Sequence, residues 1–155
     1  MKLLVTDECA RLARWLRLCG YDTVVVPAQP PTLLYRRAYE DGRIVVTRNH
    51  RVKASCLFHV VHLNHDDLTR QLQQLVNALR LTVDRETVLT RCDRCNVALE
   101  SIEKSHVKTL VPPYVFQTQD AFTRCPSCQR IYWMATHCDR MRSLFDKLKG
   151  VRPQA

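Results

Sequence analysis

The chain has 155 residues, of which 46% are hydrophobic and 25% charged, so a packed core is expected and wholesale disorder is not. This length fits one ordinary domain, or a small domain joined to a metal-stabilised module. With three glycines it contains neither GxGxxG nor GxxxxGK[ST], which excludes the common glycine-rich phosphate loops. The formal charge of +9 favours a polyanionic partner, although a solvated basic surface would give the same count.

Two sequence features bear on the compartment. Charged residues from Asp7 onward interrupt the apolar start of the chain, unlike a signal peptide, and no stretch reaches the about 20 apolar residues that cross a bilayer. Paired Cys-x-x-Cys motifs then favour a metal in a reducing environment over disulfides. We therefore expect an intracellular, cytoplasmic protein with no membrane partner. The sequence does not predict its oligomeric state.

Strands and helices alternate in the first half of the chain. Gly20 and Gly42 are placed to end two of the helices. Short, nearly continuous apolar strands between helices predict a parallel sheet covered on both faces, an α/β fold. In chain order the expected elements are strand 2–6, helix 8–19, strand 23–26, helix 32–41, strand 43–47, short helix 49–55, strand 57–63, and a helix over 68–79 capped by Asp66 or Asp67.

The composition changes near residues 80–90, where cysteines and basic residues become frequent. We therefore expect two domains, an α/β domain over 1–88 and a cysteine-containing ribbon over 89–155. A helix over 137–149 is expected to close the second domain.

Four cysteines are spaced like zinc ligands. The segments RCDRCN and RCPSCQ each contain Cys-x-x-Cys, a spacing that lets two sulfurs of one turn reach a single ion at about 2.3 Å. Four thiolates fill a tetrahedral site and leave no open position, so we expect a structural zinc ion and not a catalytic one. With Zn²⁺ the site contributes −2, which takes the charge from +9 to +7. The predicted ligands are Cys92, Cys95, Cys125 and Cys128.

Other interpretations of the cysteines remain open. A redox motif or chance spacing are alternatives, although a redox Cys-x-x-Cys normally occurs once and opens a helix. His137 and Cys138 lie near enough in sequence to substitute as ligands. Cys19 shares the apolar face of its helix with Trp15, so both are expected in the core.

Acidic and amide residues follow the predicted strands. In a parallel sheet, ligands bind beyond the carboxyl ends of the strands, where Asp7, Asn49 and Asp66 or Asp67 would meet. Glu40 lies near the end of a helix and could face the same edge. Oxygen ligands suit Mg²⁺ or Mn²⁺, which can activate water and stabilise charge on a phosphodiester. The alternative is that Asp7 and Asp66 only cap the elements that follow them.

Arginines flank the same predicted edge and are candidates for holding RNA phosphates. For those on the first helix, the alternative is a solvated helix face. The candidates are Arg11, Arg14, Arg17, Arg48 and Arg51, with His50 beside the last two.

Four sequence blocks resemble the Mut7-C ribonuclease family, which has a PIN-like nuclease domain and a C-terminal zinc ribbon. RLARWLRLCGYDT (11–23) is close to the family's LARWLR-LGYDT, and EDGRIVVTR (40–48) is like its E-x-R-I-L-L-T-R-D. RCDRCNVALE (91–100), followed by VPPYV (111–115), and CPSCQRIYWMATHCDRM (125–141) match its ribbon.

The resemblance implies a PIN-like fold, divalent-metal RNA cleavage and zinc in the ribbon. Asp7 would be the first metal carboxylate and Glu40 a helix-borne one. Asn49 stands where the family has aspartate, and Pro31 or Thr32 where it has an acidic residue. These changes should weaken metal binding unless Asp41, Asp66 or Asp67 compensates. In the ribbon, Gln129 replaces a glycine and Cys138 a tryptophan, which leaves the ligands intact.

Three functions follow from the sequence. The first is a Mg²⁺- or Mn²⁺-dependent endoribonuclease weakened by Asn49, that is, a hydrolase. The second is a non-catalytic module that binds RNA or a ribonucleoprotein. The third is a protein-interaction adaptor that uses the ribbon as its contact surface.

Overall fold

Strand β1 (Lys2–Thr6) lies inside a four-stranded parallel sheet of order β2-β1-β3-β4. Its neighbours are β2 (Asp22–Val26) and β3 (Ile44–Thr47), and β4 (Val60–His62) forms the far edge. The computed structural model describes residues 1–84, 86–134 and 136–149, the last segment without the side chains of 136–140, 142 and 149. The predicted α/β class with a parallel sheet is confirmed.

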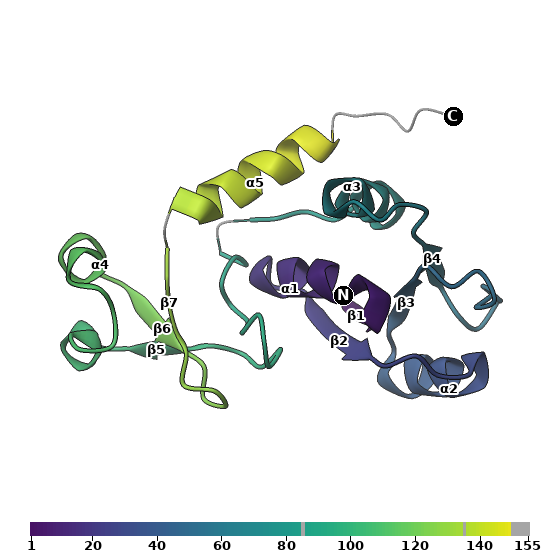
Figure 1. Ribbon diagram of the computed structural model, residues 1–155, viewed down its shortest axis with the longest axis horizontal. Coiled ribbons are helices and arrows are strands. Elements are labelled where there is room, and N and C mark those ends of the chain that lie inside the picture. Colours follow the sequence, from purple (N-terminus) through teal and green to yellow (C-terminus); the bar gives the residue numbers. More distant parts are fainter. Residues whose placement is uncertain (85, 135, 150–155) are drawn as a thin grey trace.

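Helices cover both faces of this sheet (Figure 1). A single 3₁₀ turn (η1, Asp7–Cys9) leads into α1 (Ala10–Leu18), which packs with α3 (Leu68–Leu79) on one face. Helix α2 (Pro31–Asp41) packs on the other face against a smaller core. Gly42 adopts φ 61° and ends α2, as the sequence predicted.

The loop after β3 differs from its prediction. Residues 49–55 form turns and not a helix, because the Asn49 side chain accepts a hydrogen bond from the backbone N–H of Arg51 at 3.0 Å and so competes with helical pairing. Ser55 and Phe58 then pair in a tight turn, which delays the fourth strand to Val60.

The second half contains three short antiparallel strands in the order β5-β6-β7. Residues 91–133, which carry these strands and the paired cysteines, are called the ribbon below. Its elements are β5 (Glu100–Ile102), η2 (Lys104–Val107), α4 (Pro113–Thr118), β6 (Phe122–Arg124) and β7 (Ile131–Trp133).

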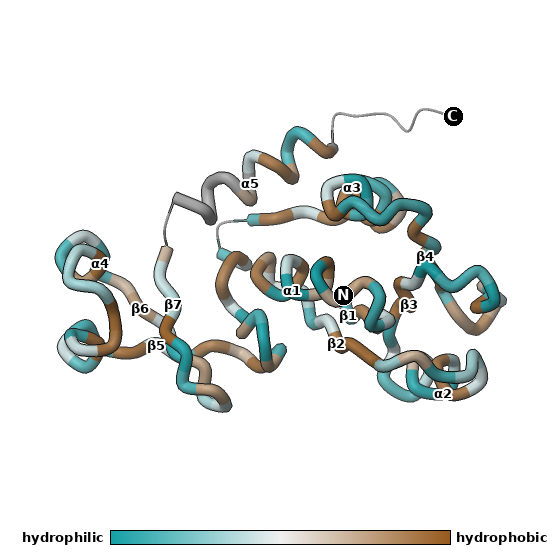
Figure 2. The backbone as a smooth tube through the Cα atoms, viewed as in Figure 1, coloured by the Kyte–Doolittle hydropathy of each residue, from teal (hydrophilic) through white to brown (hydrophobic). Residues whose placement is uncertain are grey.

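Helix α5 (Thr136–Lys149) returns from the ribbon to the α/β part and packs on α3 (Figure 1). Its Phe145 is fully buried in the same core as β1 and α1, as are Cys92 and Cys125 of the ribbon. Figure 2 shows hydrophobic residues along β2 and β3, between helices with hydrophilic outer turns. One apolar core therefore crosses residue 88, and the division into domains 1–88 and 89–155 stays a prediction.

No helix among the described residues is long and apolar enough to span a membrane.

Candidate metal centre and strand-edge site

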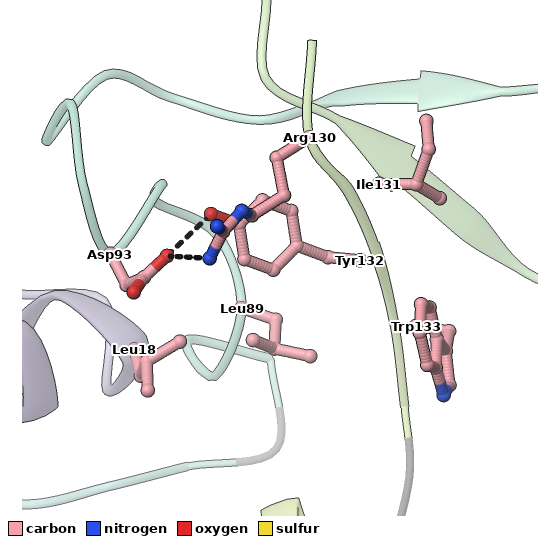
Figure 3. Close-up of a pocket in the computed structure, with 7 residues that line it drawn as sticks. All are labelled: Leu18, Leu89, Asp93, Arg130, Ile131, Tyr132 and Trp133. Atoms are coloured by element: carbon pink, nitrogen blue, oxygen red, sulfur yellow. Dashed lines mark hydrogen bonds and ion pairs between the residues drawn. The ribbon is translucent and has the colours of Figure 1, made fainter. Parts of the chain in front are cut away.

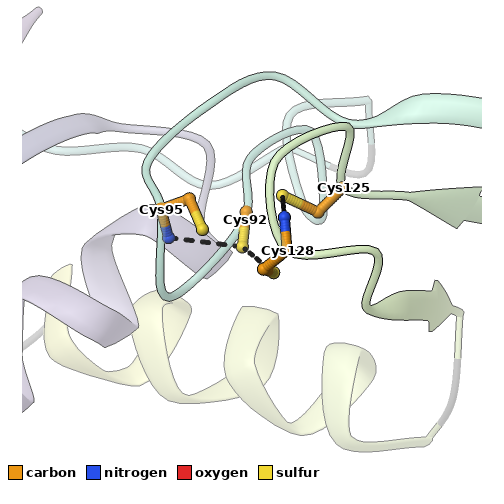
Figure 4. A group of neighbouring side chains, drawn as sticks. All are labelled: Cys92, Cys95, Cys125 and Cys128. Atoms are coloured by element: carbon orange, nitrogen blue, oxygen red, sulfur yellow. Dashed lines mark hydrogen bonds between the residues drawn. The ribbon is translucent and has the colours of Figure 1, made fainter.

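The four predicted cysteines converge between two loops (Figure 4). Their sulfur atoms all lie within 4.8 Å of one another, and those of Cys92 and Cys128 are 3.7 Å apart. Metal–sulfur bonds of about 2.3 Å in a tetrahedron require sulfurs about 3.8 Å apart. The geometry therefore fits a tetrahedral ion such as zinc.

The two cysteine loops have the same backbone hydrogen bonds. Cys95 and Cys128 each donate a backbone N–H to the sulfur of the first cysteine in their pair, at 3.3 and 3.4 Å. The next residue, Asn96 or Gln129, has positive φ (63° and 60°) and donates its N–H to the carbonyl of that first cysteine. Gln129 thus occupies a left-handed position that suits glycine, the residue typical of the family there.

Cys92 and Cys125 are the two fully buried ligands, and Cys92 is hydrogen-bonded to a tyrosine. Burial opposes its ionisation, but hydrogen bonding with Tyr132 and the loop backbone lowers the pKa of Cys92 to about 6. The Tyr132 hydroxyl lies 3.1 Å from the Cys92 sulfur. A low pKa favours the thiolate form that binds metal. The side chains of His137 and Cys138 lie outside the described residues.

Asp93, inside the first cysteine loop, is a polar anchor that the sequence did not suggest. Its side chain is 5% exposed and accepts hydrogen bonds from Arg14 at 2.6 and 3.1 Å and from Tyr132 at 2.6 Å. Arg17 is buried beside it and donates to the carbonyls of Asp93 and Arg94. These contacts fix the ribbon against α1.

Two predicted phosphate ligands therefore have other roles in this structure. Arg17 is enclosed and bonded to backbone carbonyls, including that of Thr23 at 2.8 Å. Arg14 is bound to Asp93, although its side chain is 59% exposed. Arg11 and Arg51 are exposed, and Arg48 is half-buried.

The second site lies where β1 and β3 end. Strands β2 and β3 lie on opposite sides of β1, so the chain segments that leave β1 and β3 turn in opposite directions. Parallel sheets bind ligands in the crevice that such a divergence creates. The exposed carboxylate of Asp7 accepts a 3.3 Å hydrogen bond from Ala28 N in the loop after β2. Asn49 follows β3 and donates its backbone N–H to Thr47.

Glu8 is the carboxylate at this edge that the sequence analysis missed. One of its oxygens accepts hydrogen bonds from Thr6 Oγ1 at 2.5 Å, Thr47 Oγ1 at 3.0 Å and Arg48 N at 3.1 Å. Partial burial acts to raise the pKa of Glu8, but these bonds lower it overall. In the sequence, only its position directly after Asp7 could have indicated that Glu8 belongs to this site. Glu8 joins the ends of β1 and β3.

The structure does not bring Glu40 to Asp7. Helix α2 begins near Asp7, since Ala28 bonds to it, and Glu40 lies nine residues after Pro31, about 13 Å along the axis. Its neighbour Asp41 bonds to Arg43, which also reaches the Leu3 carbonyl at the start of β1. Glu40 thus lies at the opposite edge of the sheet, and a metal centre built on Asp7 and Glu40 is excluded.

The last two predicted acids have local partners. Asp67 caps α3 by accepting a hydrogen bond from Arg70 N at 2.9 Å, as predicted for a capping residue. Asp66 is exposed and pairs with Arg48. Among the described residues, the four cysteines are the only convergent group of three or more His, Cys, Asp or Glu side chains.

Residues 1–145 match the family model described as the Mut7-C RNAse domain. The chain belongs to the Mut7-C RNAse domain family. No curated protein and no solved structure gives a significant match. Membership in the Mut7-C family indicates a ribonuclease-like function and an RNA substrate, and it accounts for the pairing of a parallel sheet with a four-cysteine ribbon.

Proposed function

We propose that this chain is a metal-dependent ribonuclease that cleaves RNA at the carboxyl ends of β1 and β3. Its divalent ion would be bound less tightly than in a site with three carboxylates. The observation that carries the proposal is the pair of consecutive carboxylates, Asp7 and Glu8, at the divergence point of a ribonuclease-family sheet. Family membership alone would not say where on the fold the reaction occurs.

The donor atoms at this edge suit a weakly held Mg²⁺ or Mn²⁺. These ions commonly bind one or two protein carboxylates, keep several waters and take further oxygens from a phosphate substrate. Asp7 supplies an exposed carboxylate, Glu8 a second one, and Asn49 a neutral amide oxygen. A bound ion would supply an activated water and offset charge on the phosphodiester.

Arginines beside the edge supply the phosphate contacts. The ion pair of Arg48 is with Asp66, whose side chain is 84% exposed, so a phosphate can replace this partner at little cost. Arg51 is exposed in the turn that the Asn49 side chain orders. RNA binding therefore needs no rearrangement of the strands.

The ribbon is proposed to hold a structural zinc ion. Four thiolates occupy every position of a tetrahedral ion, so the zinc would stabilise the fold and leave no site for water or RNA. Its loops carry Asp93 and Asn96, which contact α1 and β2. Zinc would thereby position the sheet as well as the ribbon.

A matched pair of carboxylate-to-amide variants tests the ribonuclease. End-labelled single-stranded RNA is incubated with the protein and Mn²⁺, Mg²⁺ or no added divalent ion, without a chelator that would strip the ribbon. Wild type should cleave only with added metal, Asp7→Asn should reduce cleavage at least about 100-fold, and Glu40→Gln should leave it unchanged. Undiminished cleavage by Asp7→Asn would show that the reaction does not take place at the ends of β1 and β3.

RNA binding without cleavage is the second candidate. It is favoured by the absence, within the described part of the chain, of a third carboxylate converging on Asp7 and Glu8. It predicts an intact RNA ladder after long incubation with Mn²⁺, together with binding that weakens steeply as salt rises.

A further inference from the structure

One face of the first helix connects the strand edge to the ribbon. Arg11, Arg14 and Leu18 are spaced by three and four residues in α1, which places them on one face, and η1 carries Asp7 just before this helix. Arg11 is exposed and the Arg14 side chain is 59% exposed. Because the charge of Arg14 is offset by Asp93, Arg11 is the cation that this face offers to a phosphate, and the face runs about 16 Å from Asp7 to Leu18.

A cavity of about 360 Å³ lies at the ribbon end of this face (Figure 3). Aliphatic, aromatic and charged side chains share its lining. The charged pair is Asp93 and Arg130, 3.7 Å apart, and Asp93 is already neutralised by Arg14. The other lining residues are Leu18, Leu89, Ile131, Tyr132 and Trp133.

The ribbon contains six Lys and Arg residues against four Asp and Glu residues, so a zinc ion on four thiolates (−2) leaves it without net charge, but arginines gather beside the cysteines. Four arginines lie within two residues of the cysteine ligands in sequence. Two of them, Arg94 and Arg130, are exposed. Phosphates that approach this end of the helix therefore meet exposed guanidinium groups, although the ribbon as a whole has no net charge. The four are Arg91, Arg94, Arg124 and Arg130.

We propose that this cavity binds an unpaired base of the RNA whose phosphates pass along Arg11 toward Asp7. The inference rests on the proposed function and extends it, because it makes the substrate single-stranded RNA and adds a base site about 16 Å from the reaction. A base is flat and apolar on its faces, and it stacks on aromatic rings or on an arginine plane. Trp133 and Arg130 offer such surfaces. Tyr132, by contrast, is 8% exposed, is bonded to Asp93 and lies on the other side of β7 from Trp133 (Figure 3).

The chemistry of the cavity argues for a base and against a phosphate as its occupant. Its only cation, among the seven lining residues, already faces the carboxylate of Asp93, while three aliphatic side chains and two rings supply most of the wall. Bases in a duplex are stacked and paired, so only an unpaired one can enter. Stacking tolerates any base, so we expect little sequence preference.

Binding measurements with two oligonucleotides of equal charge test the base site. A 12-mer of uridine and a 12-mer in which the sugars lack bases are compared by fluorescence anisotropy, without added magnesium or manganese. Wild type should bind the uridine oligomer at least about fivefold more tightly, the effect of one stacked base. Arg130→Gln should remove this difference.

Arg37→Gln is the matched control, since Arg37 is likewise half-exposed (48% against 41%) and pairs with a carboxylate at 3.9 Å, but on α2. It should keep the difference. A melting curve and the zinc content confirm that each variant is folded. Equal binding of the two oligomers by wild type, or equal effects of Arg130→Gln and Arg37→Gln, would overturn the base site.

A second measurement needs no substitution. Uridine oligomers with 4-thiouridine are crosslinked to wild type by light, and the modified peptide should contain Tyr132 or Trp133. Crosslinks confined to residues 48–53 would contradict the proposal. Loss of the base effect with Asp7-dependent cleavage intact rejects only the base site, whereas a base effect without cleavage rejects only the ribonuclease.

Discussion

The carboxylate of Asp93 accepts two hydrogen bonds from Arg14, 79 residues earlier in the chain, at 2.6 and 3.1 Å. Asp93 lies between two of the four convergent cysteines, and Arg14 lies on the helix that follows Asp7. A side chain inside the metal loop is therefore bonded directly to the element that leads from the proposed reaction site.

Replacing Asp93 with alanine should destabilise the protein by about 2–3 kcal/mol, since its hydrogen bonds with Arg14 are lost and the buried Tyr132 hydroxyl loses its carboxylate acceptor. Urea unfolding measures the change. Asp120→Ala is the control, because this carboxylate is 95% exposed and pairs only with Lys104 among the described contacts. It should cost less than about 1 kcal/mol. Equal losses would mean that the Asp93 network contributes nothing.

Removing a metal ligand should unfold the ribbon and loosen the sheet. Wild type is expected to hold one zinc per chain by elemental analysis, and Cys125→Ser to lose it with a fall in Tm of at least about 10 °C. Cys56→Ser should change neither quantity, because Cys56 is exposed and lies outside the convergent group. Zinc retained by Cys125→Ser would show that the ribbon does not depend on all four thiolates.

Asn49→Asp should raise Mn²⁺-dependent cleavage roughly tenfold, about 1.4 kcal/mol in the barrier, because a carboxylate binds a divalent cation better than an amide does. Asn77→Asp makes the same chemical change on α3, away from the strand edge, and should have no effect. Single-turnover rates at several Mn²⁺ concentrations separate tighter metal binding from faster chemistry. An unchanged rate in Asn49→Asp would exclude position 49 from the metal site.

Two glycines with positive φ should differ in their tolerance of alanine. A Cβ on Gly20 (φ 92°) would lie 2.3 Å from the Thr87 carbonyl oxygen, whereas a Cβ on Gly42 (φ 61°) would meet nothing within 4 Å. Gly42→Ala should cost about 1–2 kcal/mol for the left-handed backbone alone, and Gly20→Ala about 1–3 kcal/mol more for the clash. Denaturation midpoints give both values. Similar costs would mean that the segment around Thr87 moves away freely.

Stability should fall in acid partly through Asp22. Burial acts to raise the pKa of Asp22, but hydrogen bonds from Arg43 and Asn96 hold it below its ordinary value. A depressed pKa stabilises the fold fully above the unfolded value, about 3.9, and this stabilisation is lost as the pH falls through the folded value. Wild type should therefore exceed Asp22→Asn in stability at pH 6, with the gap closing below about pH 4. A difference in stability between wild type and Asp22→Asn that does not change with pH would show that the substitution acts through packing and not through the charge of Asp22.

Local patterns determined much of this structure. The strand runs, the stop at Gly42, the cap at Asp67 and the Cys-x-x-Cys loops all depend on contacts within a few residues, which periodicity and spacing record directly. The four sequence blocks also indicated the family that the match over residues 1–145 confirms. The loop at 49–55 was misassigned because one side-chain hydrogen bond at Asn49 outweighed a weak helical preference.

The sequence by itself determined which residue types were present for chemistry: four thiols, a carboxylate pair and a surplus of arginines. Only the tertiary structure decided which of them meet. It placed Glu40 near the amino ends of the strands, opposite Asp7, because a helix after a parallel strand must run back along the sheet before the next strand begins. It also enclosed Arg17 and joined Arg14 to Asp93, because burying a charge requires partners that lie close in space, however distant in sequence.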